Sequence, residues 1–179
     1  SFAAAAAGAR VLATDWAPEC IELVAFNAEA NGLTVNAAVL DWTTSKSGDG
    51  KRYDLVVAAD VLYEPRNVAP LGRLLGEAVA TDGVALIADP GRRHAPAFFE
   101  RARVEGWSVE RTSIATLPAG GIFELRREAR EASRQSLHQR PRAVDRLVGV
   151  ARKQGRLPQP DPAVVVSLIA LLPIGYLVI

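Results

Sequence analysis

The sequence predicts an α/β domain built on a doubly wound, mostly parallel sheet whose last strand is antiparallel. Between Arg10 and Glu124, short apolar runs alternate with longer amphipathic stretches, which is the pattern of strands joined by crossover helices. After Gly106, two strand-like runs follow each other with no helix between them, which indicates an antiparallel pair. A chain of 179 residues, 49% of them hydrophobic, is long enough to form one such domain around a sizeable core.

Four apolar runs are expected to form the parallel strands, and three amphipathic stretches the crossover helices. The strands are predicted at residues 10–14, 35–40, 54–59 and 84–88, and the helices at residues 18–31, 67–80 and 95–105. The first helix has signals at both ends, because Pro18 suits a first helical turn and Asn31 with Gly32 suits a C-terminal cap. Its boundaries are therefore the best defined.

The sheet is predicted to end with strands at residues 107–112 and 122–126. The Pro-Ala-Gly-Gly sequence at residues 118–121 is expected to form the loop between them. Because this connection is too short for a crossover helix, the two strands should run antiparallel.

Charge divides the chain into parts of different character. Residues 126–156 carry ten Arg and Lys against three Asp and Glu, whereas residues 1–125 carry eleven against sixteen. We expect a folded domain at residues 1–127, a basic extension or linker at 128–162 and an apolar C-terminal segment at 163–179. The extension has too few large apolar residues for a second core, and it lacks the interleaved aromatic residues of a nucleic-acid-binding arm. No nucleic-acid partner is therefore expected.

The apolar segment at residues 163–179 has three interpretations. It is uncharged and follows positive charge, as a membrane helix with its positive side inward does. It is slightly short for a membrane span, however, and contains Pro173 and Gly175. A truncated membrane helix, which would give the protein membrane contact, is preferred over an apolar helix packed on the domain or sequence joined by a gene-model error.

The cysteine and histidine content and the absence of some motifs exclude several classes of protein. With Cys20 as the sole cysteine, no disulfide can form within the chain, so a reducing, cytoplasmic location is expected. One cysteine and two distant histidines do not predict a metal site. The Gly-x-Ser-x-Gly and P-loop patterns are absent. The chain contains no methionine and opens within an alanine-rich run, so we expect it to be a fragment.

Three aspartates follow three of the predicted parallel strands at the point where each strand ends. They are Asp15, Asp41 and Asp60, and the first two are each followed by a tryptophan, Trp16 and Trp42. Ligands of an open parallel sheet bind outside the carboxyl ends of its strands. Aspartate is also common in turns and at helix N-caps, which is the alternative interpretation of each residue alone. The three together favour a nucleoside ligand.

The chemistry of these side chains matches the parts of a nucleoside. In nucleotide-binding sheets, a carboxylate after the second strand accepts hydrogen bonds from ribose hydroxyls. Asp15 suits this role, although it follows the first strand that is predicted in this chain. A carboxylate at the next strand end can accept from the adenine amine, and an indole offers the purine an apolar face. Asp41, Trp42 and Trp16 suit this second role.

Four sequence stretches resemble one family of enzymes. They are Ala-Thr-Asp-Trp at residues 13–16, Leu-Asp-Trp at 40–42, Tyr-Asp-Leu-Val-Val-Ala-Ala-Asp-Val-Leu-Tyr-Glu at 53–64 and Phe-Glu-Leu-Arg-Arg at 123–127. Together they resemble the class I, seven-β-strand methyltransferases of the family 16 lysine-methyltransferase group. That group includes the lysine methyltransferases of the electron-transfer flavoprotein β-subunit. The resemblance covers about residues 1–127, and its most specific element is the Asp-x-x-Tyr motif of Asp60 and Tyr63.

The resemblance implies a Rossmann-like methyltransferase sheet and S-adenosyl-L-methionine as the methyl donor. It places Asp15 at the ribose, Asp41 and Trp42 at the adenine, and Asp60 with Tyr63 at the methyl-accepting group. Ala59, at the end of the same strand as Asp60, joins Trp16 among the expected cofactor contacts.

The chain departs from the family at its beginning. The family's first strand and Gly-x-Gly loop, which bind the methionine part of the cofactor, would precede Ser1, and Gly8 alone does not replace them. Residues 1–7 would then be the rest of the helix that follows this loop. The first strand of the sheet is thus expected to be missing, and the chain as given is expected to bind the cofactor poorly and to be inactive on its own.

The expected activity is protein-lysine N-methylation by a monomer. Methyl transfer to an amine needs a neutral nucleophile and a water-poor site that aligns donor and acceptor. Asp60 would orient the amine, and the Tyr63 ring would pack on the lysine side chain. The alternative is that Asp60 caps the next helix and Tyr63 packs in the core.

Two other activities stay open from the sequence. One is methylation of a small amine of the nicotinamide type, and the other is a NAD-binding oxidoreductase, because Asp15 would serve a NAD ribose equally well. The loop that follows the fourth parallel strand contains three weaker candidates for contact with a substrate or partner. His94 could touch a substrate and Arg92 with Arg93 could meet an acidic partner surface, although solvent exposure is the preferred interpretation of all three.

Overall fold

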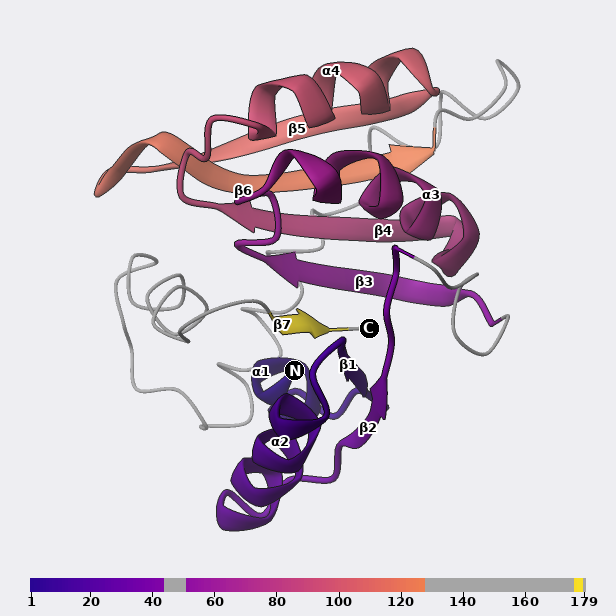
Figure 1. Cartoon of the computed structure of the whole chain (residues 1–179), viewed down its shortest axis with the longest axis vertical. Coiled ribbons are helices and arrows are strands. Elements are labelled where there is room, and N and C mark those ends of the chain that lie inside the picture. Colours follow the sequence, from indigo (N-terminus) through magenta and orange to yellow (C-terminus); the bar gives the residue numbers. More distant parts are fainter. Residues whose placement is uncertain (44–50, 128–175, 179) are drawn as a thin grey trace.

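Strands and helices alternate along most of the chain and assemble into one sheet with helices packed on it (Figure 1). The computed structural model describes residues 1–43, 51–127 and 176–178. In chain order, its elements are α1 (Phe2–Ala6), β1 (Leu12–Asp15), α2 (Pro18–Ala30), β2 (Asn36–Val39), β3 (Tyr53–Ala59), the 3-10 helix η1 (Pro65–Asn67), α3 (Val68–Ala78), β4 (Val79–Asp89), α4 (Ala95–Val104), β5 (Trp107–Ile114), β6 (Leu117–Arg127) and β7 (Tyr176–Val178). The predicted basic extension at 128–162 lies outside the described residues.

The described strands follow one another across the sheet in the order β2, β1, β7, β3, β4, β6 and β5. β1 runs parallel to β2, and β3 runs parallel to β4. β6 then pairs antiparallel with both β4 and β5. The prediction of parallel strands closed by an antiparallel strand is confirmed.

β7 lies in the middle of the sheet although it comes from the C-terminal segment. It pairs antiparallel with β1 at Ala13 and Thr14, and with β3 at residues 57–59. A membrane helix was expected over 163–179, and at residues 176–178 this expectation is wrong, because these residues form a strand that pairs antiparallel with β1 and β3. The rest of that segment lies outside the described residues. Among the helices of the described ranges, none is long and apolar enough to cross a membrane.

The second predicted helix ends two residues earlier than expected. Its last turn reaches Ala78, and Val79 then adopts an extended conformation and pairs with Tyr53 as the first residue of β4. Valine is branched at Cβ and favours extended backbone, which accounts for the change at this position. Asn67, predicted as the first helical residue, belongs to η1.

The loop predicted at residues 118–121 is instead part of β6. The guanidinium of Arg111 in β5 donates hydrogen bonds of 2.7 Å to the carbonyl oxygen of Pro118 and 2.6 Å to that of Gly120. Gly121 also pairs with Ser113 across the two strands. Because of these contacts, β5 and β6 stay paired at the glycines that had suggested a loop.

The main core lies between the sheet and helices α3 and α4, which cover the same face of β3, β4 and β6 (Figure 1). α3 contributes side chains spaced three or four positions apart, and these are Leu71, Leu74, Leu75 and Ala78. On β4, Ala85 and Ile87 belong to this core, whereas Val84 and Leu86 belong to a smaller apolar cluster. This alternation with a period of two places the two clusters on opposite faces of the sheet.

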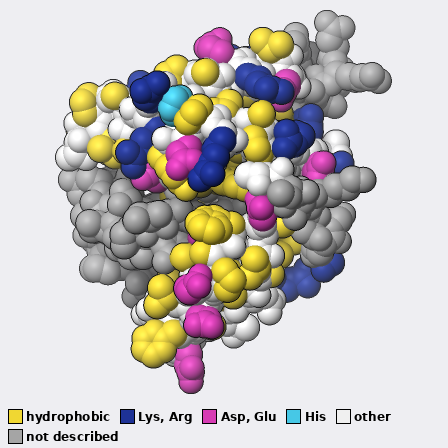
Figure 2. Space-filling view, in the orientation of Figure 1, with side chains coloured by type: hydrophobic (Ala, Val, Ile, Leu, Met, Phe, Trp, Pro, Cys, Tyr) yellow, Lys and Arg dark blue, Asp and Glu magenta, His cyan; other side chains and the backbone are white. Residues whose placement is uncertain are grey.

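α2 has the ends that the sequence predicted. Pro18 lies in its first turn, and Gly32 follows its last turn with a positive φ of 62°. Only Val24 and Ala28 of this helix are buried, whereas Leu23 and Phe26 are exposed. Figure 2 shows hydrophobic and acidic side chains together over this part of the molecule.

Candidate functional site

The carboxyl ends of the parallel strands place four aspartates along one edge of the sheet. Asp15 is the last residue of β1, Asp60 directly follows β3, and Asp89 is the last residue of β4. Asp41 lies two residues beyond β2, whose Val39 is paired with Asp15. Because β7 separates β1 from β3, the edge has two halves, one with Asp15 and Asp41 and the other with Asp60 and Asp89.

Asp60 has an unusual backbone conformation at the end of β3. Its φ is +54°, and among the described residues other than glycine it alone has a positive φ. Aspartate tolerates this left-handed conformation better than most residues, yet the conformation still costs about 1 kcal/mol. The amide N–H of Asp60 donates to the carbonyl oxygen of Ala88 on β4 at 2.8 Å, which holds the turn in place. The strand thus ends abruptly and leaves the Asp60 side chain at the edge.

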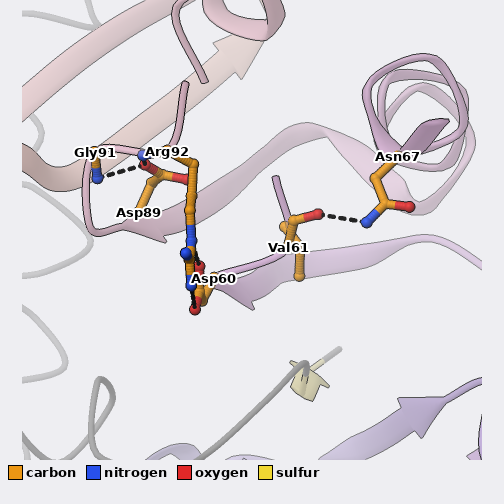
Figure 3. A network of polar contacts seen from close by, with 6 residues as sticks. All are labelled: Asp60, Val61, Asn67, Asp89, Gly91 and Arg92. Atoms are coloured by element: carbon orange, nitrogen blue, oxygen red, sulfur yellow. Dashed lines mark hydrogen bonds and ion pairs between the residues drawn. The ribbon is translucent and has the colours of Figure 1, made fainter. Parts of the chain in front are cut away.

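The carboxylate of Asp60 is paired with the guanidinium of Arg92 (Figure 3). Nε of Arg92 donates to Oδ1 at 2.7 Å, and Nη2 donates to Oδ2 at 2.6 Å. The hydrogen bond to Asp60 is the main cause that raises the pKa of Arg92. Arg92 is exposed, as expected, and the acidic group that it contacts belongs to its own chain. Both residues follow predicted parallel strands, but no local signal in the sequence pairs their side chains.

Asp89 organises the loop that carries Arg92. Its Oδ1 accepts hydrogen bonds from the amide N–H groups of Gly91 at 2.7 Å and Arg92 at 2.8 Å. Gly91 has a φ of +102°, and a Cβ atom there would lie 2.8 Å from the Cβ of Ala119. Asp89 is only 3% exposed, and burial raises the pKa of its carboxyl group. Sequence reasoning did not single out Asp89 as a site residue.

Tyr63 lies in the turn between β3 and η1, and its side chain reaches the surface with 37% of the residue exposed. The neighbouring Val61 and Leu62 are buried. The side-chain amide of Asn67 donates to the carbonyl oxygen of Val61 at 2.9 Å and closes the turn (Figure 3). The alternative in which Tyr63 packs in the core is therefore wrong.

The other half of that alternative, in which Asp60 caps the next helix, is also wrong. Neither η1 nor α3 has a side-chain hydrogen bond at its N-cap. Both oxygens of the Asp60 carboxylate are instead directed to Arg92 (Figure 3). The Asp60 carboxylate thus lies at the edge of the sheet, paired with Arg92.

Asp15 is nearly buried at the end of β1. Its Oδ1 accepts a hydrogen bond of 2.9 Å from the amide N–H of Ala17, and burial raises the pKa of its carboxyl group despite that bond. The nearby thiol of Cys20 has a smaller, opposite effect and lowers the pKa of this carboxyl group. Trp16 extends into solvent with 65% of the residue exposed, so an unoccupied indole surface lies next to this carboxylate in sequence.

Asp41 and Trp42, the residues expected at the adenine, already have contacts within the chain. Oδ1 of Asp41 accepts from the amide N–H and the hydroxyl of Thr43, at 2.8 and 2.5 Å. Trp42 is half-buried and packs against the main core, together with Leu40. Of the two tryptophans predicted beside the ligand, Trp16 therefore offers the larger free surface.

Comparison with known proteins shows the family to which this chain belongs. Residues 1–104 match the family model described as lysine methyltransferase, which covers more than half of the chain. The chain belongs to this family and is an S-adenosylmethionine-dependent methyltransferase. No curated protein matches its sequence.

Solved structures of methyltransferases share the fold. A TehB-like S-adenosylmethionine-dependent methyltransferase from Corynebacterium glutamicum is 19% identical with a TM-score of 0.52, over 67% of this chain and 68% of that one. DhpI in complex with S-adenosylhomocysteine is 21% identical with a TM-score of 0.52, over 69% and 70%. The 16S rRNA methyltransferase RmtF in complex with S-adenosyl-L-homocysteine is 21% identical with a TM-score of 0.50, over 65% and 47%. Because an rRNA methyltransferase has this fold, the fold does not support our expectation that nucleic acid is not a partner.

The described side chains suit the nucleoside part of S-adenosylmethionine. The Asp15 carboxylate at the end of β1 has the charge and the acceptor oxygens that suit ribose hydroxyls. The exposed ring of Trp16 and the carboxylate of Asp41 match the apolar face and the amine of adenine. These residues belong to β1, β2 and the turns that follow them, so one half of the edge carries the groups that suit the cofactor.

Proposed function

We propose that this methyltransferase transfers the methyl group of S-adenosylmethionine to the ε-amino group of a protein lysine. The observation that carries the proposal is the turn after β3, where Asp60 stands at a φ of +54° and Tyr63 reaches the surface three residues later. The turn supplies one anionic and one aromatic group, which are the groups that recognise a long aliphatic amine. The membership in a lysine methyltransferase family supports this acceptor. We place the chain with the lysine methyltransferases of the electron-transfer flavoprotein β-subunit type.

In this proposal, Asp60 and Tyr63 bind and orient the acceptor. The Asp60 carboxylate accepts a hydrogen bond from the amine and directs its lone pair, while the Tyr63 ring packs against the aliphatic stem. When bound, S-adenosylmethionine supplies an electrophilic methyl group. Once the ammonium group has lost a proton to solvent, Asp60 and Tyr63 would hold the amine nitrogen in line with that methyl group, with S-adenosylhomocysteine as the leaving group, and this alignment would contribute much of the acceleration.

The cofactor residues of the proposal lie on the other half of the edge. Asp15 would hold the ribose, and Asp41, Trp16 and Trp42 would surround the adenine. Ala59, the last residue of β3 and the neighbour of Asp60, would be a further cofactor contact. What supports this assignment is the position of β1 and β2 side by side, which brings Asp15 and Asp41 to the same edge.

The organisation of the chain is part of the same proposal. Residues 1–127 would form the catalytic domain, with 128–162 as a basic extension and 163–179 as an apolar segment. The pairing of Tyr176–Val178 with β1 and β3 indicates that the end of this segment belongs to the sheet of the domain.

Cofactor binding is the first experiment. Calorimetric titration of the 179-residue chain with S-adenosylhomocysteine is expected to show weak binding, which the double variant Asp15→Ala, Asp41→Ala loses. An Asp54→Ala variant is the matched control, because Asp54 is an exposed strand residue away from the carboxyl edge. Equal binding by the double variant and the control would contradict the assignment of Asp15 and Asp41.

The acceptor is tested with tritiated S-adenosylmethionine and three acceptor preparations. They are a protein extract, the same extract with its lysines chemically acetylated, and nicotinamide as a small amine. Label in the untreated extract alone supports a protein lysine, and its loss in Asp60→Asn assigns the turn after β3 to the acceptor. Label in nicotinamide alone would establish a small-molecule methyltransferase and would overturn the lysine acceptor.

A further inference from the structure

Arg92 and Asp60 each have a backbone amide fixed by a hydrogen bond, whereas their side chains are partly exposed. The amide N–H of Asp60 is bound to Ala88, and that of Arg92 to the carboxylate of Asp89. The Asp60 side chain, however, is 35% exposed and that of Arg92 is 45% exposed. The two side chains can therefore separate by rotation while the turns that carry them stay in place.

An ion pair with this exposure is easily broken. Water solvates both charges when they separate, so exposed ion pairs contribute little to stability. Salt screens them further. A second cation that reaches Asp60 can thus compete with Arg92 for the carboxylate.

The guanidinium of Arg92 has the chemistry of a protonated alkylamine substrate. Both groups are cations that donate several N–H hydrogen bonds and accept none. Arg92 uses Nε and Nη2 to bind both oxygens of Asp60, so it occupies the positions that an incoming ammonium group would use (Figure 3). A neutral alcohol of the same length carries no charge with which to replace it.

We propose that Arg92 holds Asp60 as an internal stand-in for the substrate, and that an alkylammonium group binds by displacing the Arg92 guanidinium from the Asp60 carboxylate. The proposal rests on the proposed function, because it takes Asp60 as the group that receives the amine. Arg92 acts through Asp60 and is a positioning residue. Its exchange makes the site selective for cationic side chains and keeps the carboxylate paired in their absence.

The exchange is observed by nuclear magnetic resonance of the Arg92 side chain. The Nε–H signal is assigned by its loss in Arg92→Gln, and its position without a carboxylate partner is found in Asp60→Asn. We expect n-butylammonium chloride to move the signal of the full chain toward the position found in Asp60→Asn. n-Butanol at the same concentration is expected to leave it in place, and sodium chloride is expected to move it less than n-butylammonium chloride does, because neither supplies an alkylammonium group.

The affinity for n-butylammonium gives a second readout, followed through the backbone amide of Asp60. Arg92→Gln removes the competing cation and is expected to strengthen binding by up to about fivefold, which corresponds to about 1 kcal/mol for an exposed ion pair. Arg93→Gln is the matched control, since Arg93 is the exposed neighbour of Arg92 and is expected to leave the affinity unchanged. Arg92→Lys, which replaces the two-pronged contact by a single donor group, is expected to give an intermediate increase.

Three results would overturn the exchange. They are a bound n-butylammonium that leaves the Arg92 signal in place, no binding of n-butylammonium, and an Arg92→Gln affinity equal to that of Arg93→Gln. If Arg92→Gln fails to fold, Arg92→Lys supplies the same comparison. Methyl transfer is measured separately, so a chain that methylates lysine but keeps Arg92 on Asp60 refutes the exchange alone. A chain that exchanges Arg92 but transfers label to nicotinamide alone refutes the lysine acceptor and leaves the exchange standing.

Discussion

The side-chain amide of Asn67 donates a buried hydrogen bond of 2.9 Å to the carbonyl oxygen of Val61. This contact spans the turn that carries Tyr63 and joins the end of β3 to the start of α3 (Figure 3). The surface position of Tyr63 thus depends on a hydrogen bond made by a residue that is itself only 5% exposed.

Replacing Asn67 tests this turn. Asn67→Ala leaves the Val61 carbonyl oxygen without its donor, and we expect the free energy of unfolding to fall by about 1–3 kcal/mol. Asn27→Ala, on the solvent side of α2, is the control and should change it by less than about 0.5 kcal/mol. Urea unfolding of the two variants measures both values. Equal stability would show that the Asn67 hydrogen bond does not hold the turn.

The core between α3 and the sheet should be sensitive to cavities. Leu71 is fully buried, and Leu71→Ala is expected to lower the free energy of unfolding by about 2–5 kcal/mol. Leu23→Ala makes the same chemical change on the half-exposed side of α2 and should cost less than about 1 kcal/mol. Thermal and urea unfolding compare the two. A Leu71→Ala variant as stable as Leu23→Ala would contradict the packing described here.

Gly91 should tolerate a side chain poorly. Its φ of +102° disfavours any residue with a Cβ atom, and that atom would lie 2.8 Å from the Cβ of Ala119. Gly32 also has a positive φ, but a Cβ atom there would meet nothing within 4 Å. We expect Gly91→Ala to be less stable than Gly32→Ala by about 1–3 kcal/mol in urea unfolding. The reverse order would show that the loop after β4 adjusts freely.

Asp89 should make stability depend on pH. Burial raises the pKa of its carboxyl group above the ordinary value of 3.8, so the folded chain binds this proton more tightly than the unfolded chain. The contribution of Asp89 to the free energy of unfolding therefore falls as the pH rises from 3.8 through the raised pKa.

Asp89→Asn removes this titration and isolates its effect. The free energy of unfolding of the variant minus that of the wild type is expected to increase with pH across this window and then to level off. Urea unfolding at intervals between about pH 4 and 8 measures the difference. A difference that stays constant over the whole range would show that burial does not raise the pKa of Asp89.

Tyr63 is expected to act through its ring. If the ring packs on the lysine stem, Tyr63→Ala should lower kcat/KM by about tenfold, whereas Tyr63→Phe should stay within about twofold of the wild type. Both are measured with tritiated S-adenosylmethionine and the protein extract as acceptor. A Tyr63→Phe variant as impaired as Tyr63→Ala would assign the role to the hydroxyl group instead.

The elements that could be predicted are those whose signals are local. The ends of α2 follow from Pro18 and Gly32, which act within one helical turn. The alternation of apolar and polar residues locates β3 within one residue of its actual start at Tyr53. Asp15 and Asp60 lie at the carboxyl edge as predicted, because a strand and the residue after it are adjacent in the chain. Their roles toward ligands stay predictions.

The contacts that could not be predicted join distant parts of the chain. Arg92 meets Asp60 across 32 residues, and Arg127 donates to the carbonyl oxygen of Gly76 across 51. Whether Trp16 or Trp42 packs on the core depends on which face each turn presents, and both follow an Asp in the sequence.

Composition and periodicity were thus enough to establish an α/β sheet with aspartates at its strand ends, since each of these features depends on neighbours in the chain. The pairing of Arg92 with Asp60 and the insertion of Tyr176–Val178 between β1 and β3 emerged from the folded chain alone. Both depend on which strands become neighbours in the sheet, and hydrogen bonding between strands places no requirement on their distance along the sequence.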